Sequence, residues 1–137
     1  MRYFILFLLS VTISGCATTE IINQIPVPQI QASQQAQLKV CRKYIFLGDA
    51  AATIASVDRR PILRSSAGKC FSAKVVPGPH TLGVMTQSFA GLEMSELEFI
   101  LQEGQTKFFK INFDKLYESS ESEFSEFSTY EQVVVQQ

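Results

Sequence analysis

Residues 70–84, CFSAKVVPGPHTLGV, decide the fold class of this 137-residue chain. Apolar and polar side chains alternate over Cys70 to Val76, and the alternation resumes over Thr81 to Thr86, after the turn Pro77-Gly78-Pro79-His80. Because successive side chains of a β-strand point to opposite faces, this period of two predicts two strands joined as a hairpin. The inward-facing positions are all apolar: Phe71, Ala73, Val75, Leu82 and Val84.

Short strand-like segments also lie on both sides of this stretch. They are separated by turn residues and cover 38–47, 51–57, 62–63, 97–101 and 106–113. No sustained helical period interrupts them, so helices are not expected within this region. The pattern predicts an all-β fold, a small antiparallel sandwich of two sheets with about seven strands, formed by residues 38–113.

Four stretches in this order resemble a known family: LKVCR, VDRRPIL, GKCFSAKVVPGPHTLGV and LEFILQEGQTKFFKINF. The family consists of small bacterial lipoprotein domains of unknown function, and it is similar to PEGA-type and carboxypeptidase-regulatory-like sandwiches. Seven positions match its pattern: Arg42, Asp58, Pro77, Gly78, His80, Leu82 and Gly104. Arg59 replaces the usual turn glycine, and Phe108-Phe109 replaces two tyrosines. The resemblance implies a binding, spacing or wall-associated module with no assigned activity.

The first residues predict an export signal. A single arginine precedes the apolar run Tyr3 to Ile13, which is about half the roughly 20 residues that a membrane-spanning helix needs. The run ends in Ile13-Ser14-Gly15-Cys16, which resembles the bacterial lipobox. By that resemblance, the signal peptide 1–15 is cut between Gly15 and Cys16, and Cys16 is diacylated and anchors the chain in a membrane. The alternative is an ordinary secretory signal followed by a buried cysteine.

The residues after the anchor predict where the protein resides. Neither Ala17 nor Thr18 is the aspartate that resembles an inner-membrane retention signal. We therefore expect a bacterial envelope lipoprotein of the outer membrane that faces the periplasm. Residues 16–37 are rich in glutamine and contain Pro26 and Pro28, which favours a flexible tether of several tens of ångströms. In the alternative, isoleucines of this segment dock on the domain: Ile21, Ile22, Ile25 and Ile30.

Cys41 and Cys70 remain as an even pair once Cys16 is acylated. A disulfide between them fits an oxidising compartment and would close a loop of about 30 residues. The alternative is two free, buried thiols, because sequence spacing does not show whether the side chains meet. Cys70 falls on the polar face of its strand, with Ser72 and Lys74.

The residues offer little catalytic chemistry. Nucleophilic catalysis needs a base beside the nucleophile, and the chain has one histidine, His80, which we interpret as a structural turn residue. Cys41, Cys70 and His80 lack the fourth ligand and the paired spacing of zinc motifs. The formal net charge of −1, with no extended basic face, argues against nucleic-acid binding. We expect no enzyme activity, no metal and no cofactor.

Two functions remain. The first is a structural or protein-interaction module that meets another envelope protein. The second is binding of a small ligand or a cell-wall glycan by exposed aromatic side chains beside a basic cluster. The residues expected in that site are Tyr44, Phe46, Tyr117, Arg59, Arg60 and Arg64.

The tail, residues 114–137, is acidic and aromatic. Phe124, Phe127 and Tyr130 recur every three residues, close to a helical period. We expect a short C-terminal helix that docks this aromatic stripe on the sandwich, followed by an edge strand at Val133 to Val135. The alternatives are a disordered tail and a partner-binding segment that folds on contact.

The predicted strand register has a direct test. Val75→Asp should unfold the domain because a charge would enter the core, whereas Lys74→Asp on the opposite face should have a mild effect. Urea unfolding of both variants beside the wild type measures the two effects. Equal losses of stability would mean that the register is wrong.

Overall fold

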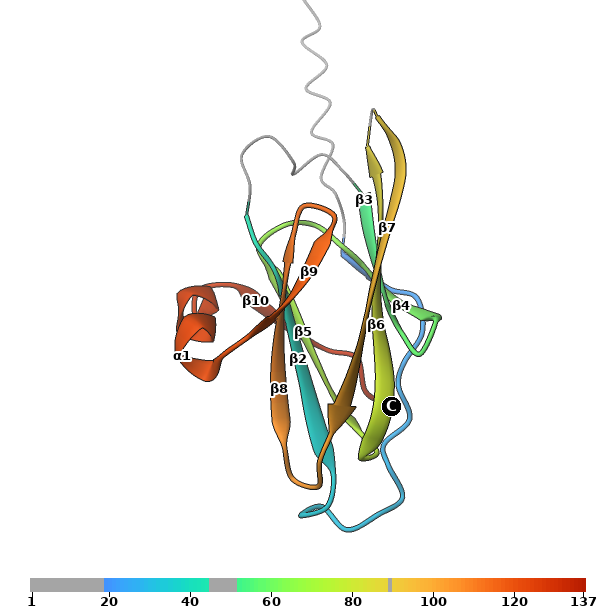
Figure 1. The fold of residues 1–137 in the computed structure, drawn as a ribbon, viewed down its shortest axis with the longest axis vertical. Helices are drawn as coiled ribbons and strands as arrows, with labels where there is room; N and C mark the ends of the chain where they lie inside the picture. Colours follow the sequence, from blue (N-terminus) through green and yellow to red (C-terminus); the bar gives the residue numbers. More distant parts are fainter. Residues whose placement is uncertain (1–18, 45–51, 89) are drawn as a thin grey trace, which may run out of the picture.

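Strands dominate the part of the chain that the computed structural model describes, residues 19–44, 52–88 and 90–137 (Figure 1). They form two five-stranded sheets that pack face to face. The first sheet, in spatial order, contains β1 (Glu20–Ile21), β4 (Arg60–Ser65), β3 (Ala52–Val57), β6 (Gly78–Ser88) and β7 (Gly91–Leu101). The second contains β10 (Glu131–Val134), β5 (Lys69–Val75), β2 (Ala36–Arg42), β8 (Thr106–Asn112) and β9 (Lys115–Ser119). The prediction of an all-β sandwich of two sheets is confirmed, with ten strands among the described residues instead of about seven.

The second sheet is mixed, whereas an antiparallel sandwich was expected. The first sheet is antiparallel throughout, but β2 runs parallel to β8, and β10 runs parallel to β5. Parallel neighbours require a long connection. Between β2 and β8 the chain builds β3 to β7, including four strands of the first sheet, and this supplies the connection.

The stretch 70–84 forms an arch, not the predicted hairpin. β5 belongs to the second sheet and β6 to the first, so Val76 and Pro77 carry the chain from one sheet to the other. The predicted register is nevertheless correct, since Val75 is buried and Lys74 is exposed. Alternation specifies which face of each strand is buried, but it does not specify whether consecutive strands pair with each other.

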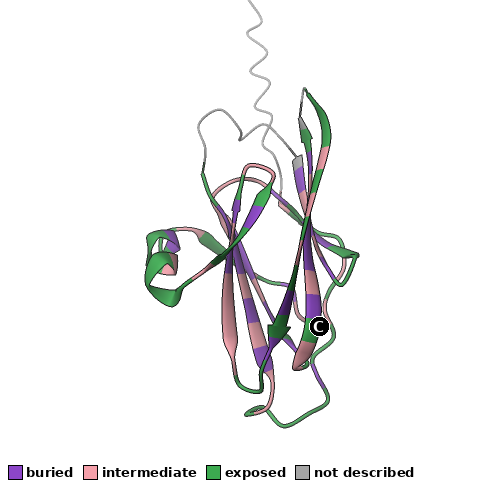
Figure 2. Cartoon of the chain, viewed as in Figure 1, coloured by how far each residue is buried: buried purple, intermediate pink, exposed green. Residues whose placement is uncertain are grey.

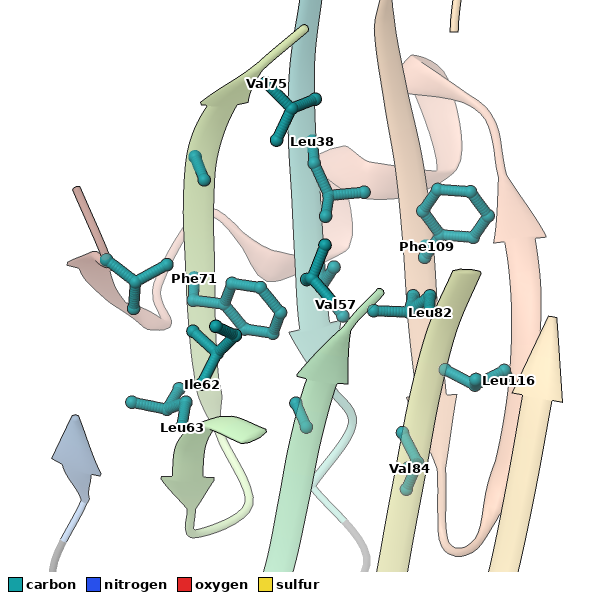
Figure 3. Close-up of a cluster of buried hydrophobic side chains, with 14 of the residues drawn as sticks. Leu38, Val57, Ile62, Leu63, Phe71, Val75, Leu82, Val84, Phe109 and Leu116 are labelled. Atoms are coloured by element: carbon teal, nitrogen blue, oxygen red, sulfur yellow. The ribbon is translucent and has the colours of Figure 1, made fainter. Parts of the chain in front are cut away.

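The core lies between the inner faces of the two sheets, where buried residues follow one another along the central strands (Figure 2). Figure 3 shows Leu38 and Phe109 of the second sheet and Val57 and Leu82 of the first among these side chains. One charged side chain joins the sheets inside this layer. Arg42 is buried, and its Nη1 donates a hydrogen bond of 2.6 Å to the carbonyl oxygen of Ser65, at the end of β4.

The segment before β2 packs along the sandwich, so the tether predicted for residues 16–37 is wrong for the described residues 19–37. β1 pairs with β4, and the Ile22 N–H donates to the Ile62 carbonyl at 2.7 Å. Of the four isoleucines that the docking alternative named, Ile25 packs against the core cluster, whereas Ile21, Ile22 and Ile30 are exposed. Composition favoured a tether because glutamine and proline are common in linkers, but backbone hydrogen bonds do not depend on composition.

The segment around Ile25 meets the C-terminal residues at the edge of the sandwich. The Ile25 N–H donates to the Val135 carbonyl at 2.8 Å, and the Gln137 N–H donates to the Ile25 carbonyl at 3.2 Å. The amide Nε2 of Gln136 also donates to the Ile25 carbonyl at 2.8 Å. Val135 is fully buried. The N-terminal and C-terminal segments therefore close the side of the sandwich formed by β1, β4, β5 and β10.

A disulfide joins β2 to β5 on the outer face of the second sheet. Cys41 lies directly opposite Cys70 in the antiparallel pairing, and the two sulfurs are bonded. The prediction of a disulfide is thus confirmed, and the alternative of two free thiols is wrong. Both cysteines are buried, although Cys70 shares its face with polar residues, because Phe127 covers them.

The acidic-aromatic tail supplies this cover. β9 comes first, and then α1 (Glu121–Phe124) and a single 3-10 turn (Ser125–Phe127) form the short C-terminal helical segment. Ser120 caps α1 by accepting from the Glu123 N–H at 3.3 Å. Phe124, Phe127 and Tyr130 pack edge to face in sequence, with ring centroids 5.2 and 5.0 Å apart. β10 then forms the expected edge strand, so the tail is part of the domain, which extends beyond the predicted 38–113.

Removing the disulfide should destabilise the domain while leaving its fold intact. The bond closes a loop between positions 29 residues apart, and in the chain-entropy model such a loop is worth about 3 to 4 kcal/mol. The double variant Cys41→Ala, Cys70→Ala should therefore unfold at a lower urea concentration, and its free energy of unfolding should be smaller by that amount. An unchanged midpoint would show that the bond contributes nothing to stability.

Candidate functional site

Four of the six residues predicted for the binding site, Tyr44, Arg59, Arg60 and Arg64, do not come together in the structure. Arg59 and Arg60 lie at the turn between β3 and β4 of the first sheet, whereas Tyr44 follows β2 of the second sheet. Arg64 is four residues beyond Arg60 on β4, which corresponds to about 13 Å along a strand. The Tyr44 N–H donates to the Tyr130 hydroxyl at 2.9 Å, so this position contacts the C-terminal segment. The structure therefore keeps Arg59 and Arg60 together and separates them from Tyr44 and Arg64.

Three other predicted positions lie outside the described residues. They are Gly15 and Cys16 of the lipobox-like motif and Phe46. Tyr117 lies on β9 and is 42% exposed.

An apolar cleft opens at the end of the sandwich where β5 passes into β6. Its volume is about 360 Å³. Its floor consists of the core residues Val57, Ile62 and Val75, and its outer wall is the N-terminal segment from Ile25 to Pro28. Three polar side chains complete the lining: Asp58, Arg60 and His80. An apolar concavity with a few convergent polar groups is the usual form of a small-molecule site.

The polar rim of the cleft is built on a tight turn. Val57 pairs with Arg60, so the two residues between them, Asp58 and Arg59, form a two-residue hairpin loop. Both have positive φ, 51° and 62°, as a type I′ turn requires. The Asp58 N–H donates to the Thr81 carbonyl at 2.8 Å, and the Thr81 N–H donates to Asp58 Oδ1 at 3.0 Å. The turn is thereby fixed to β6.

His80 links this turn to the arch between β5 and β6. Its Nδ1 lies 2.9 Å from Asp58 Oδ2, and its Nε2 lies 2.7 Å from the Val76 carbonyl oxygen. The ring is buried, and its centroid is 5.9 Å from that of Phe99. A carboxylate and a carbonyl are both acceptors, so the ring donates to both only when it carries two protons. Both ring nitrogens therefore face acceptor oxygens of the fold.

A second cleft lies on the other side of the Asp58–His80 pair. Its volume is about 420 Å³, and it is lined by Pro79, Thr81, Glu98, Phe99 and Ile100 in addition to the pair. The pair therefore separates two hollows of the same end of the sandwich.

The N-terminal wall is the part of the site that sequence reasoning missed. Arg60 Nη2 lies 3.5 Å from Asn23 Oδ1, and Asn23 Nδ2 donates to the Pro61 carbonyl at 2.7 Å. These contacts hold Ile25 and the following prolines over the cleft. The isoleucines of residues 16–37 indicated that this segment could dock on the domain, but nothing in the sequence indicates which strand they contact.

Two carboxyl groups with shifted pKa values lie away from the cleft. The pKa of Glu93 is raised, first by a hydrogen bond with Asp114 and then by repulsion between the two carboxylates. The pKa of Glu123 is lowered, first by a hydrogen bond from Ser119 and then by Lys110. Glu93 lies on β7, and Glu123 lies in α1.

Neither a metal cluster nor a spanning helix is present in the described part of the chain. No group of three or more metal-ligating side chains gathers in residues 19–44, 52–88 and 90–137. In the same residues, no helix is long and apolar enough to cross a membrane.

Comparison with models of known protein families and with curated proteins gives no match to this chain. A function is therefore inferred from the site itself and from the sequence motifs.

Arg59 offers a test of the turn. A side chain in the left-handed region costs about 1 to 2 kcal/mol, and glycine avoids this cost. Arg59→Gly should therefore stabilise the domain by about 1 kcal/mol in urea unfolding. Arg59→Ala is the matched control, because it removes the same exposed contact with Glu96 and keeps the strained backbone. Equal stability of the two variants would contradict the type I′ assignment.

Proposed function

We propose that this protein is a lipid-anchored lipoprotein of the bacterial envelope, attached through Cys16, whose sandwich is a non-catalytic interaction module. The observation that carries the proposal is the motif Ile13-Ser14-Gly15-Cys16 at the end of a short apolar run. A diacylated cysteine gives stable membrane attachment, since each buried methylene contributes about 0.8 kcal/mol.

The disulfide supports an extracytoplasmic location. Disulfides persist in oxidising compartments such as the periplasm and are rare in the cytosol. The Cys41–Cys70 bond and the export signal therefore agree. With Ala17 and Thr18 after the anchor, we place the protein on the outer membrane, facing the periplasm.

The surroundings of His80 support a non-catalytic role. A general base needs a free ring nitrogen within reach of a nucleophile. Here Asp58 and the Val76 carbonyl occupy the two nitrogens, and these contacts hold the β3–β4 turn against β6. The histidine is thus explained by structure alone.

Intact-mass analysis of the membrane fraction tests the anchor. The wild type should begin at Cys16 and carry the added mass of acyl chains, and Cys16→Ser should lose both this mass and membrane attachment. A soluble chain without acyl mass in the wild type would contradict the proposal.

Binding of a small ligand in the apolar cleft is a second candidate, and the cleft itself favours it. Its floor is apolar, and Arg60 is the basic group at its rim. This combination suits a mainly apolar molecule that bears one acidic group. Because Tyr44 and Arg64 lie elsewhere, the predicted glycan site with its aromatic platform has less support than this cleft.

Anilinonaphthalene sulfonate is a suitable probe, since it is apolar and anionic. The folded protein should bind it saturably with a rise in fluorescence, and Arg60→Ala should weaken this binding by several fold. Arg64→Ala, which removes an arginine of the same strand outside the cleft, should leave binding unchanged. Equal weakening by both substitutions, or no saturable binding, would exclude the cleft as the site.

A further inference from the structure

The N-terminal end of the described chain points toward the tip of the β6–β7 hairpin. β1 is antiparallel to β4, β4 is antiparallel to β3, and β3 is antiparallel to β6. β1 therefore runs opposite to β6. Because β6 runs toward the hairpin tip, the N-terminal end of β1 lies on the side of the sheet where the tip is. Figure 1 shows this hairpin extending past the strands beside it.

The strand register gives the height of the tip above β1. Glu20 pairs with Arg64, Arg64 with Ile54, and Ile54 with Met85, so these residues form one row across the sheet. β6 continues for three residues beyond Met85 to its final pair, Ser88 with Gly91. At about 3.3 Å per residue, the tip rises about 10 Å above the row of Glu20.

The covalent chain limits the height of the anchor in the same way. Cys16 precedes Glu20 by four residues, so it lies at most about 14 Å from Glu20, even when the chain is fully extended. Glu20 itself is held in place, since Thr19 Oγ1 and Ser66 Oγ share a hydrogen bond of 3.3 Å and Ile22 bonds to β4. The acylated Cys16 therefore lies at most about 4 Å beyond the height of the hairpin tip, so a bilayer that holds it and lies across the strand direction meets the tip.

The side chains of the tip suit a lipid surface. Residues 90–92, AGL, contain no charged residue. Leu92 and Met94 on the following strand are 59% and 70% exposed. Apolar side chains beside a covalent lipid add to membrane attachment when they enter the interface between headgroups and acyl chains.

We propose that the tip of the β6–β7 hairpin, Ala90 to Leu92, lies against the lipid surface beside the acylated Cys16. This inference rests on the proposed lipid anchor, and it specifies how the domain is oriented on the membrane. The exposed tip contacts the same bilayer that holds the anchor. The short connection between Cys16 and Glu20 would bring the hairpin tip to the membrane. The exposed Leu92 would then stabilise the tip there.

This orientation directs the apolar cleft away from the membrane. His80 lies five residues before Met85 on β6, about 17 Å from that row in the direction opposite to the tip. The cleft opens at this distal end, where a partner or ligand in the periplasm reaches it without displacing lipid.

Quenching by labelled lipids tests the orientation in the full-length acylated protein. Ala90→Cys places a thiol at the tip, and Gln102→Cys is the matched control at the exposed turn of the opposite end. The native cysteines are acylated or disulfide-bonded in this protein, so each variant carries one thiol for an environment-sensitive fluorophore. The proteins are placed in vesicles of phosphatidylethanolamine and phosphatidylglycerol that contain a lipid with a quencher near its headgroup.

The label at position 90 should lose at least twice the fraction of fluorescence that the label at position 102 loses. Equal losses in a protein whose intact mass shows acylated Cys16 would overturn the orientation and leave the proposed anchor standing. A mass without acyl chains would overturn the anchor and the orientation with it.

Discussion

The disulfide-linked pairing of β2 with β5 is the contact on which the rest of the structure depends. β2 is the central strand of its sheet, and Cys41 and Cys70 place an apolar bond on the outer face. An apolar group on that face needs a cover, and Phe127 provides it from the acidic tail. The chain then returns along β5 as β10, which brings Val135 to Ile25. The cover over this bond thus leads the C-terminal segment to the segment around Ile25.

The position of the chain ends has a functional consequence. β1 begins at Glu20, so only three residues would separate the proposed anchor at Cys16 from this strand. Under the proposed function, an anchor this near to β1 would hold the domain close to the membrane, whereas a long tether would let it sample many distances. The N-terminal segment also forms the wall of the cleft, so the element nearest to the anchor shapes the site at the distal end.

Local patterns in the sequence predicted the features that local physics controls. Alternation along residues 70–76 identified the buried face of β5, and the period of Phe124, Phe127 and Tyr130 identified the packed aromatic stripe. Pairing between distant segments left no such signal. The turn at Pro77 is compatible with a hairpin and with an arch, and only the packing of two sheets selects the arch. The Gln-rich segment pairs with β4 through its backbone, which composition does not report.

The candidate site was less predictable than the fold because it combines three separate regions. Asp58 and Arg60 come from one hairpin, His80 from the next sheet strand, and Ile25 from the N-terminal segment. The sequence indicated a basic turn at 58–60. Arg64 was grouped with this turn because it is only four residues from Arg60 in the sequence, although the two positions are about 13 Å apart along the strand.

Hydrogen exchange at individual amides tests most directly the central claim that the chain ends are structural parts of the sandwich. The Ile22, Ile25 and Val135 N–H groups donate to backbone carbonyls at 2.7, 2.8 and 3.2 Å. Their exchange should be slowed to nearly the level of β5, because they open only when the sandwich edge opens. Exchange of the Ile22 and Ile25 amides at the rate of an unstructured peptide would contradict this claim and would mean that the N-terminal segment is a flexible tether.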